Sequence, residues 1–203
     1  DGKVAAVTSG EPEADQVVDA TGKIVTPGFI DIHMHEDPVG PDGKLVKTED
    51  TAIFNCMLRM GVTTAIGGQC GLNQYDPGDY LDLIDRDGAA VNVGMLAGHA
   101  YFREKAGHAD KYTPVTEAEL TAMEADMAHA LDRGCLGISY GIRYVPGIDH
   151  RELERTAALC RKQDKMIAAH IRSDAEEVLD AAREFLDVGQ ALGLSTQVSH
   201  IGS

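Results

Sequence analysis

The sequence has few cations and no long apolar run. Lys and Arg number 18 against 33 Asp and Glu, which leaves a formal net charge of −15. Phosphate backbones and anionic lipids are bound through Lys and Arg, so this balance argues against nucleic acid and membrane surfaces as partners. No apolar run approaches the roughly 20 residues that span a bilayer, and the first ten residues do not resemble a signal peptide. We therefore expect a cytoplasmic protein.

Cysteine is also scarce and widely spaced. None of the four cysteines stands in a Cys-x-x-Cys pattern. That excludes the usual spacing of a zinc ribbon or redox pair, and a disulfide scaffold is not expected. Cys56, Cys135 and Cys160 are expected to be packing residues. Cys70 stands between glycines in GGQCG, which indicates a close backbone approach, and it is either a buried hydrophobe or a metal ligand.

Short apolar runs alternate with longer amphipathic stretches. Nearly continuous apolar character is typical of strands in a parallel sheet that is covered on both faces. Each interval between runs has room for one helix and two loops, which predicts an α/β fold of β/α units. A doubly wound sheet and a (β/α)8 barrel both fit, but the first run is not followed by Gly-x-Gly-x-x-Gly. The runs are residues 28–35, 62–70, 91–99, 135–141, 166–173 and 195–201.

Several helix starts are readable between these runs. A Thr, Asp or Ser that stands three positions before a Glu predicts a capped helix N-terminus. Three such pairs occur, and further helices are expected near residues 49–60 and 77–87. The pairs are Thr116 with Glu119, Asp149 with Glu152, and Ser173 with Glu176.

The first 27 residues differ from the rest. They contain short β-like runs around the turn Asp-Ala-Thr-Gly, which predicts part of a small β-sandwich domain over residues 1–27. Residues 28–203 then hold about six β/α units, which is an incomplete (β/α)8 barrel.

Histidines gather at the ends of the predicted strands. In a parallel barrel these ends meet at one face, and imidazole and thiolate groups that converge there form a transition-metal site. The side chains of His33 and His35 are two apart on one predicted strand and would point to the same side. Taken singly, His170 and His200 would be ordinary core histidines, but their matching positions favour ligation. The strand-end residues are His33, His35, Cys70, His99, His170 and His200.

The segment PGFIDIHMHED resembles the first barrel strand of the amidohydrolase superfamily. GVTTAIGGQCG, AGHAYFRE, GISYGIRYVPG, AHIRS and QVSHIGS resemble, in order, the next strands of the N-acyl-D-amino-acid deacylases, or D-aminoacylases. The resemblance implies a small β-sandwich and a metal-dependent (β/α)8 TIM barrel. It implies a tightly bound zinc on Cys70, His170 and His200, and a second, weaker divalent metal site on His33 and His35.

The resemblance also implies a reaction, the hydrolysis of the amide bond of a small-molecule N-acyl-D-amino acid. Arg172 would hold the substrate carboxylate bidentately, or would instead form a loop salt bridge. Tyr140, Tyr144 and His99 are expected substrate-pocket residues, His99 alternatively supporting a ligand. The family's catalytic aspartate lies on the eighth strand. Two more units would need about 60 further residues, so we expect the general base beyond residue 203, in a C-terminal part that completes the enzyme.

Two other functions stay open. Dihydroorotases and hydantoinases, the cyclic amidases of the superfamily, use a carboxylated lysine in the fourth strand. The segment GISYGIRY contains no lysine, which favours the cysteine-type branch. A second departure is Gly202, which stands where many deacylases have a lysine. A catalytically silent interaction protein with this fold is the third alternative, and the oligomeric state is not predicted.

Overall fold

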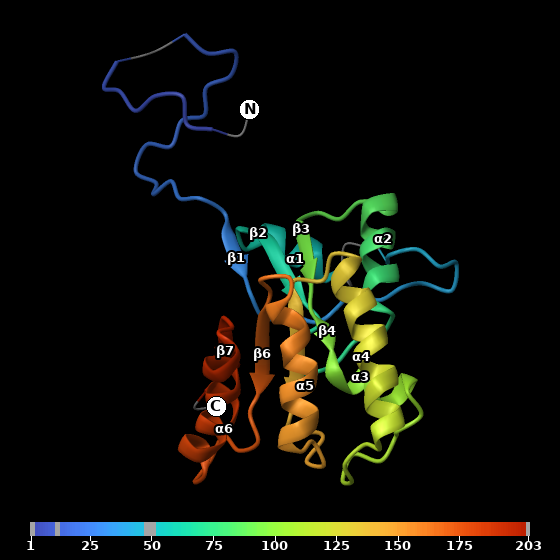
Figure 1. Cartoon of the computed structure of the whole chain (residues 1–203). Coiled ribbons are helices and arrows are strands. Elements are labelled where there is room, and N and C mark those ends of the chain that lie inside the picture. The colour runs from blue at the N-terminus through green and yellow to red at the C-terminus, as the bar shows by residue number, and fades with distance from the viewer. Residues whose placement is uncertain (1–2, 11–12, 47–51, 202–203) are drawn as a thin grey trace.

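The computed structural model describes residues 3–10, 13–46 and 52–201 (Figure 1). Strands and helices alternate through most of this range, as the apolar runs predict. In chain order the elements are β1 (Phe29–Asp31), α1 (Ile53–Arg59), β2 (Val62–Gly67), α2 (Pro77–Asp87), β3 (Asn92–Met95), β4 (Ala97–Gly98), α3 (His99–Lys105), α4 (Glu117–Asp132), β5 (Gly137–Gly141), α5 (His150–Arg161), β6 (Met166–His170), α6 (Val178–Leu192) and β7 (Thr196–Val198).

Every pair of neighbouring strands is parallel. The strands form two sheets with the orders β1-β2-β3 and β4-β5-β6-β7. Only Leu96 separates β3 from β4, and its amide donates to the carbonyl of Gly67 at 3.0 Å. The third predicted run is therefore split in two, and each of the six runs contains a strand. The predicted α/β fold of parallel β/α units is confirmed.

The core lies between the strands and the helices that follow them. Neighbouring helices α4, α5 and α6 lie next to one another along the strands (Figure 1). In β5 the fully buried Ile138 and Tyr140 alternate with Ser139 and Gly141. Ile138 and Tyr140 join the apolar cluster that includes Leu153 of α5. Because side chains alternate along a strand, Ser139 and Gly141 face the opposite side of the sheet.

Two of the three predicted helix caps are confirmed. The Thr116 hydroxyl accepts from the amide of Glu119, and the Glu119 carboxylate accepts from the amide of Thr116 at 2.7 Å. Asp149 accepts from the amide of Glu152 at 2.8 Å and caps α5. The third prediction is wrong, because α6 begins only at Val178 and has no side-chain cap. The Ser173 hydroxyl accepts instead from the amide of Ala175, within the turn that precedes the helix.

The remaining helix predictions hold in part. The predicted helix 77–87 is α2, which Asp76 caps by accepting from the amide of Gly78 at 3.1 Å. The predicted helix 49–60 is observed as α1, and residues 49–51 lie outside the described range. None of the helices within the described residues is long and apolar enough to cross a bilayer.

The N-terminal segment extends away from the strands (Figure 1). Its described residues, 3–10 and 13–27, are mostly exposed and contain no assigned strand. The division of the chain into a sandwich portion and a barrel portion stays a prediction.

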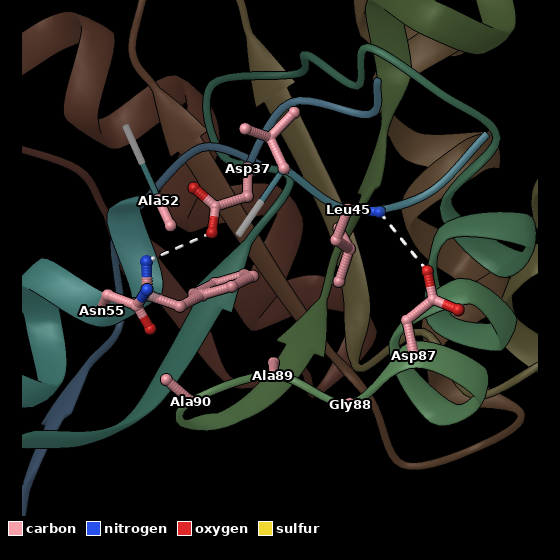
Figure 2. Close-up of a pocket in the computed structure, with 10 residues that line it drawn as sticks. Asp37, Leu45, Ala52, Asn55, Asp87, Gly88, Ala89 and Ala90 are labelled. Carbon is pink, nitrogen blue, oxygen red and sulfur yellow. Dashed lines mark hydrogen bonds between the residues drawn. The ribbon is translucent and has the colours of Figure 1, made fainter. Parts of the chain in front are cut away.

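A buried carboxylate anchors α1. The first amides of a helix have no partner within the helix, and here Asp37 accepts from the amides of Ile53 at 2.6 Å and Phe54 at 3.2 Å. Burial raises the pKa of Asp37. Figure 2 shows this carboxylate at one side of a cavity of about 410 Å³, opposite Leu45 and Asp87. Asp37 thus fastens the segment after β1 to the helix that precedes β2.

The reciprocal cap of α4 gives a stability prediction. Thr116→Ala removes the side-chain partner of the Glu119 amide, so the free energy of unfolding should fall by about 1 kcal/mol. The matched control is Thr121→Ala on the exposed face of the same helix, where alanine favours the helix and little stability is lost. Urea unfolding of both variants checks this, and equal losses would show that the cap does not stabilise α4.

Candidate metal centre

Three side chains from distant parts of the sequence converge at the C-terminal ends of the strands. Cys70 follows β2, His33 follows β1 and His200 follows β7. The Cys70 sulfur lies 3.5 Å from Nε2 of His33 and 3.6 Å from Nε2 of His200. The three ligand atoms all lie within 4.8 Å of one another. The predicted meeting of strand ends therefore brings a thiol and two imidazoles together.

His170, at the end of β6, joins this group through its neighbours. Its Nδ1 lies 3.1 Å from Nε2 of His200 and 3.0 Å from the hydroxyl of Tyr144. Its Nε2 is buried without a hydrogen-bond partner and lies 3.6 Å from a carboxylate oxygen of Asp174. Nδ1 is thus the nitrogen that faces the other ligands. We call His33, Cys70, His170 and His200 the strand-end cluster.

His35 lies beside the strand-end cluster but is exposed. Its ring is perpendicular to that of His33, with 6.1 Å between the centroids. The premise that both histidines sit on one strand is wrong, because β1 ends at Asp31. The Asp31 carboxylate accepts from the amide of His33 at 2.9 Å, within the turn that ends the strand.

The backbone around Cys70 explains its flanking glycines. Cys70 has φ +57°, in the left-handed region, and Gly68 and Gly71 lie at +72° and +75°. A Cβ at Gly71 would come within 2.6 Å of the amide nitrogen of Gly141. The close approach indicated by GGQCG is confirmed, and its target is the backbone at the end of β5.

Burial shapes the protonation of the strand-end cluster. It lowers the pKa of His33, and the neighbouring His200 and His35 lower it further. Burial and His200 likewise lower the pKa of His170, while burial raises the pKa of the Cys70 thiol. Neutral imidazoles keep a lone pair for a metal.

The donor set fits zinc. One cysteine sulfur and several imidazole nitrogens are typical zinc ligands. Nε2 of His33 lies 3.5 Å from the Cys70 sulfur, and Nδ1 of His170 lies 3.1 Å from Nε2 of His200, so the ring nitrogens face one another as potential ligand atoms. These residues are therefore suited to hold the metal that the sequence predicts.

Polar residues that the sequence analysis missed hold the loops of the site. Asn73 donates to the Glu36 carboxylate at 2.7 Å and accepts from the amide of Gly98 at 2.6 Å. Gln69 donates to the carbonyl of Ile32 at 2.6 Å. Each of these side chains stands within a few residues of a predicted strand end, and that position is the signal that could have revealed them.

Tyr140 lies in the core and not at the strand-end cluster. It is fully buried, and its hydroxyl contacts that of Thr156 on α5 at 2.9 Å. Burial raises its pKa well above the usual value. The prediction that Tyr140 lines a substrate pocket conflicts with its position on the helix-facing side of β5. Tyr144, which is 44% exposed, does lie at the cluster.

Arg172 forms the loop salt bridge that the sequence left as an alternative. Its guanidinium donates to the Glu184 carboxylate at 2.8 and 2.7 Å and to the carbonyls of Pro146 and Ile148. Arg172 falls within the predicted strand run 166–173, but β6 ends at His170, so Arg172 lies in the loop.

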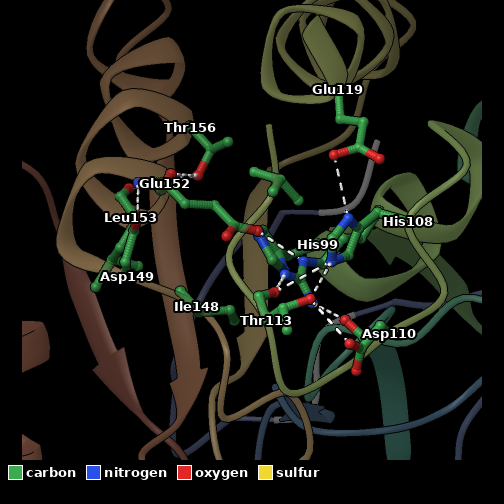
Figure 3. A network of polar contacts seen from close by, with 12 residues as sticks. His99, His108, Asp110, Thr113, Glu119, Ile148, Asp149, Glu152, Leu153 and Thr156 are labelled. Atoms are coloured by element: carbon green, nitrogen blue, oxygen red, sulfur yellow. Dashed lines mark hydrogen bonds and ion pairs between the residues drawn. The ribbon is translucent and has the colours of Figure 1, made fainter. Parts of the chain in front are cut away.

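His99 belongs to a buried ionic network, part of which Figure 3 shows. It is the first residue of α3, and its Nε2 lies 2.9 Å from a carboxylate oxygen of Glu152. Arg103 donates to the same oxygen at 2.9 Å and to the carbonyls of Asp110 and Thr113. His99, Arg103 and Glu152 are at most 2% exposed. His99 therefore ties α3 to α5.

The chain is similar to known metal-dependent hydrolases. The model of the amidohydrolase family matches residues 16–139. An N-acyl-D-glutamate deacylase of Alcaligenes xylosoxydans xylosoxydans is 30% identical over 92% of this chain and 41% of its own length.

Solved structures show the same likeness. The N-acyl-D-glutamate deacylase of Bordetella bronchiseptica, complexed with zinc and a phosphonate mimic of the tetrahedral intermediate, has a TM-score of 0.77. It is 31% identical over 88% of this chain and 41% of that chain. A D-aminoacylase with a binuclear metal centre, described by one-metal activation and second-metal attenuation, has a TM-score of 0.73. It is 27% identical over 86% of this chain and 40% of that chain. The present chain thus spans about two fifths of the length of these relatives.

The buried ionic network predicts a large stability effect. Glu152→Ala leaves Arg103 buried without its carboxylate, so the free energy of unfolding should fall by about 3–5 kcal/mol. Glu154→Ala, two residues along the same helix, removes a carboxylate that is 53% exposed and should change stability by no more than about 0.5 kcal/mol. Guanidinium unfolding measures both, and a small loss for Glu152→Ala would contradict the role of the network.

The cysteines predict a pattern of chemical labelling. Cys56 is exposed, so its expected packing role is wrong, while Cys135 and Cys160 are buried. Burial raises the pKa of Cys135 and Cys160 to about 12. At pH 8 such a thiol is ionised in roughly one molecule in ten thousand. Mass spectrometry after brief alkylation should find Cys56 labelled and these two unlabelled until the chain is unfolded. Equally fast labelling of Cys160 would contradict its burial.

Proposed function

The chain belongs to the amidohydrolase family, and from that premise we propose that the protein carrying it hydrolyses the amide bond of N-acyl-D-amino acids to a carboxylate and a free amino acid. The observation that supports this most is the convergence of Cys70, His33 and His200 at the strand ends. The similar proteins include a zinc-bound N-acyl-D-glutamate deacylase and a D-aminoacylase. A small-molecule N-acyl amino acid is therefore the proposed substrate.

The proposed metal ligands follow the strand-end cluster. Cys70, His170 and His200 would hold a tightly bound zinc, and His33 and His35 would serve a second, weaker divalent site. The Cys70 sulfur is about equally far from Nε2 of His33 and Nε2 of His200, at 3.5 and 3.6 Å. When bound, zinc supplies Lewis acidity that activates water and polarises a carbonyl near neutral pH.

Side chains beside the strand-end cluster would orient the substrate. The Tyr144 hydroxyl is within 3.0 Å of His170 and half exposed, so it can donate a hydrogen bond to a bound acyl group or carboxylate. Arg172 would have to leave Glu184 to bind a carboxylate, which makes Tyr144 the stronger choice. The general base would be the aspartate of the eighth strand that the family resemblance implies. A cytoplasmic location stays a prediction.

Substrate profiling separates the proposed activity from its nearest alternative. The protein that carries this chain should release a carboxylic acid and a free D-amino acid from N-acyl-D-amino acids. Ring opening of dihydroorotate or a hydantoin without acid release would instead support a cyclic amidase. If the protein catalyses neither reaction and also lacks stoichiometric zinc, the result would support the catalytically silent interaction protein.

Metal binding tests the role of Cys70. Loss of a group that only orients a metal ligand weakens metal binding roughly 10- to 100-fold. Cys70→Ala removes a ligand itself, so it should weaken zinc binding by more than this. The matched control is Cys56→Ala, which removes an exposed thiol far from the strand ends. Zinc content by elemental analysis and affinity by competition with a chromophoric chelator measure the effect. Unchanged zinc binding in Cys70→Ala would overturn the ligand assignment.

A further inference from the structure

Cys70 has a backbone conformation that its surroundings must maintain. Its φ of +57° lies in the left-handed region, which residues other than glycine seldom adopt. Such a residue persists where the surrounding structure holds it in place. The sulfur is brought to His33 and His200 by this conformation, so whatever holds the loop also positions the thiol.

Ser139 on β5 is bonded to both ends of this loop. Its hydroxyl donates to the carbonyl of Gly68 and accepts from the amide of Gly71 at 3.0 Å. In a four-residue turn these two groups commonly bond each other. Here the hydroxyl bridges them instead, so the turn from Gly68 to Gly71 is closed through a side chain of β5, a strand of the other sheet. Ser139 is fully buried, and no water is needed to complete these bonds.

The rest of the same face of β5 is shaped to the loop. Gly141 lies two residues after Ser139, and a Cβ there would collide with the carbonyl oxygen of Cys70. The amide of Ala100 donates to the carbonyl of Gly71 at 2.9 Å. The loop thus has a backbone contact at Gly141, a backbone bond at Ala100, the bond from the Gln69 side chain to Ile32, and the Ser139 bridge between its two ends.

We propose that Ser139 is a positioning residue that holds the Cys70 loop in the conformation needed for metal ligation. The proposal rests on the proposed function in that Cys70 is taken as a metal ligand. Without the hydroxyl, the Gly68 carbonyl and the Gly71 amide lose their shared partner. Two buried groups are then unpaired, and the turn can relieve this only by closing on itself and moving Cys70.

The test compares Ser139→Ala with Ser139→Thr in the protein that carries this chain. Cobalt(II) titration reports thiolate ligation through a sulfur-to-metal charge-transfer band, independently of activity. Alkylation of Cys70 in the metal-free protein, on a Cys56→Ala background, reports the position of the thiol without any metal. The control is Ile138→Val, which trims a fully buried side chain of the same strand on its helix-facing side.

Ser139→Ala should weaken cobalt binding roughly 10- to 100-fold, the range typical of groups that orient a metal ligand. It should also change the Cys70 alkylation rate, and Ser139→Thr should restore both. Ile138→Val should lower stability without changing either. Unaltered cobalt affinity and alkylation rate in folded Ser139→Ala would overturn the proposal, as would an equal change in Ile138→Val.

The same measurements separate this proposal from the proposed function. A wild-type protein without a cobalt–thiolate band overturns the ligand role of Cys70. The metal-free alkylation rates then decide whether Ser139 still positions the thiol. If Ser139→Ala does not fold, Ser139→Thr is compared with Ser139→Val, because the two side chains have the same shape and only Thr has a hydroxyl. Weaker cobalt binding in folded Ser139→Val than in Ser139→Thr supports the positioning role. Equal cobalt binding, or failure of Ser139→Val to fold, overturns the proposal in favour of a purely structural role.

Discussion

Parallel pairing of the strands is the constraint on which the site depends. Because every strand runs the same way, the segments that follow β1, β2, β6 and β7 leave the sheets at the same edge. Each of these segments carries one member of the strand-end cluster. A thiol at residue 70 and an imidazole at residue 200 therefore meet although 130 residues separate them. The strand-end cluster is a consequence of topology before it is a consequence of any local motif.

Topology brings the loops together, but buried polar bonds set their conformation. A loop that enters the interior carries amides and carbonyls that must find partners. Asn73 provides two of these bonds, to the carbonyl of Leu96 and to the amide of Gly98 at the end of β4. Ser139 provides two more from β5. The glycines at positions 68, 71 and 141 leave room for the backbones to approach. The interior surface near the cluster is consequently made of small and polar residues, while the large apolar ones face the helices.

The sequence predicts the strands, the helices and the residue types that meet at the strand ends better than it predicts which way individual side chains point. The strand runs, the α4 cap and the grouping of Cys70 with His33 and His200 follow from periodicity and residue type. Tyr140 faces the helices and Arg172 forms the alternative loop salt bridge for one physical reason. Alternation along a strand shows which residues share a face, but not which face is inward or at which residue the strand ends. In β5 the inward residues are Ser139 and Gly141, and β6 stops before Arg172.

Charge explains why a metal suits this cluster. The chain carries a net charge of −15, which favours cations and opposes an anionic substrate. Several arginines already have carboxylate partners, as Arg103 has in Glu152 and Arg172 in Glu184. Burial lowers the pKa of the His33 and His170 imidazoles, which favours their neutral form. A divalent ion held by these neutral ligands would be the largest local charge in the site and would reverse the local sign. The carboxylate of the substrate proposed above would then be attracted by the metal and not by the acidic chain as a whole.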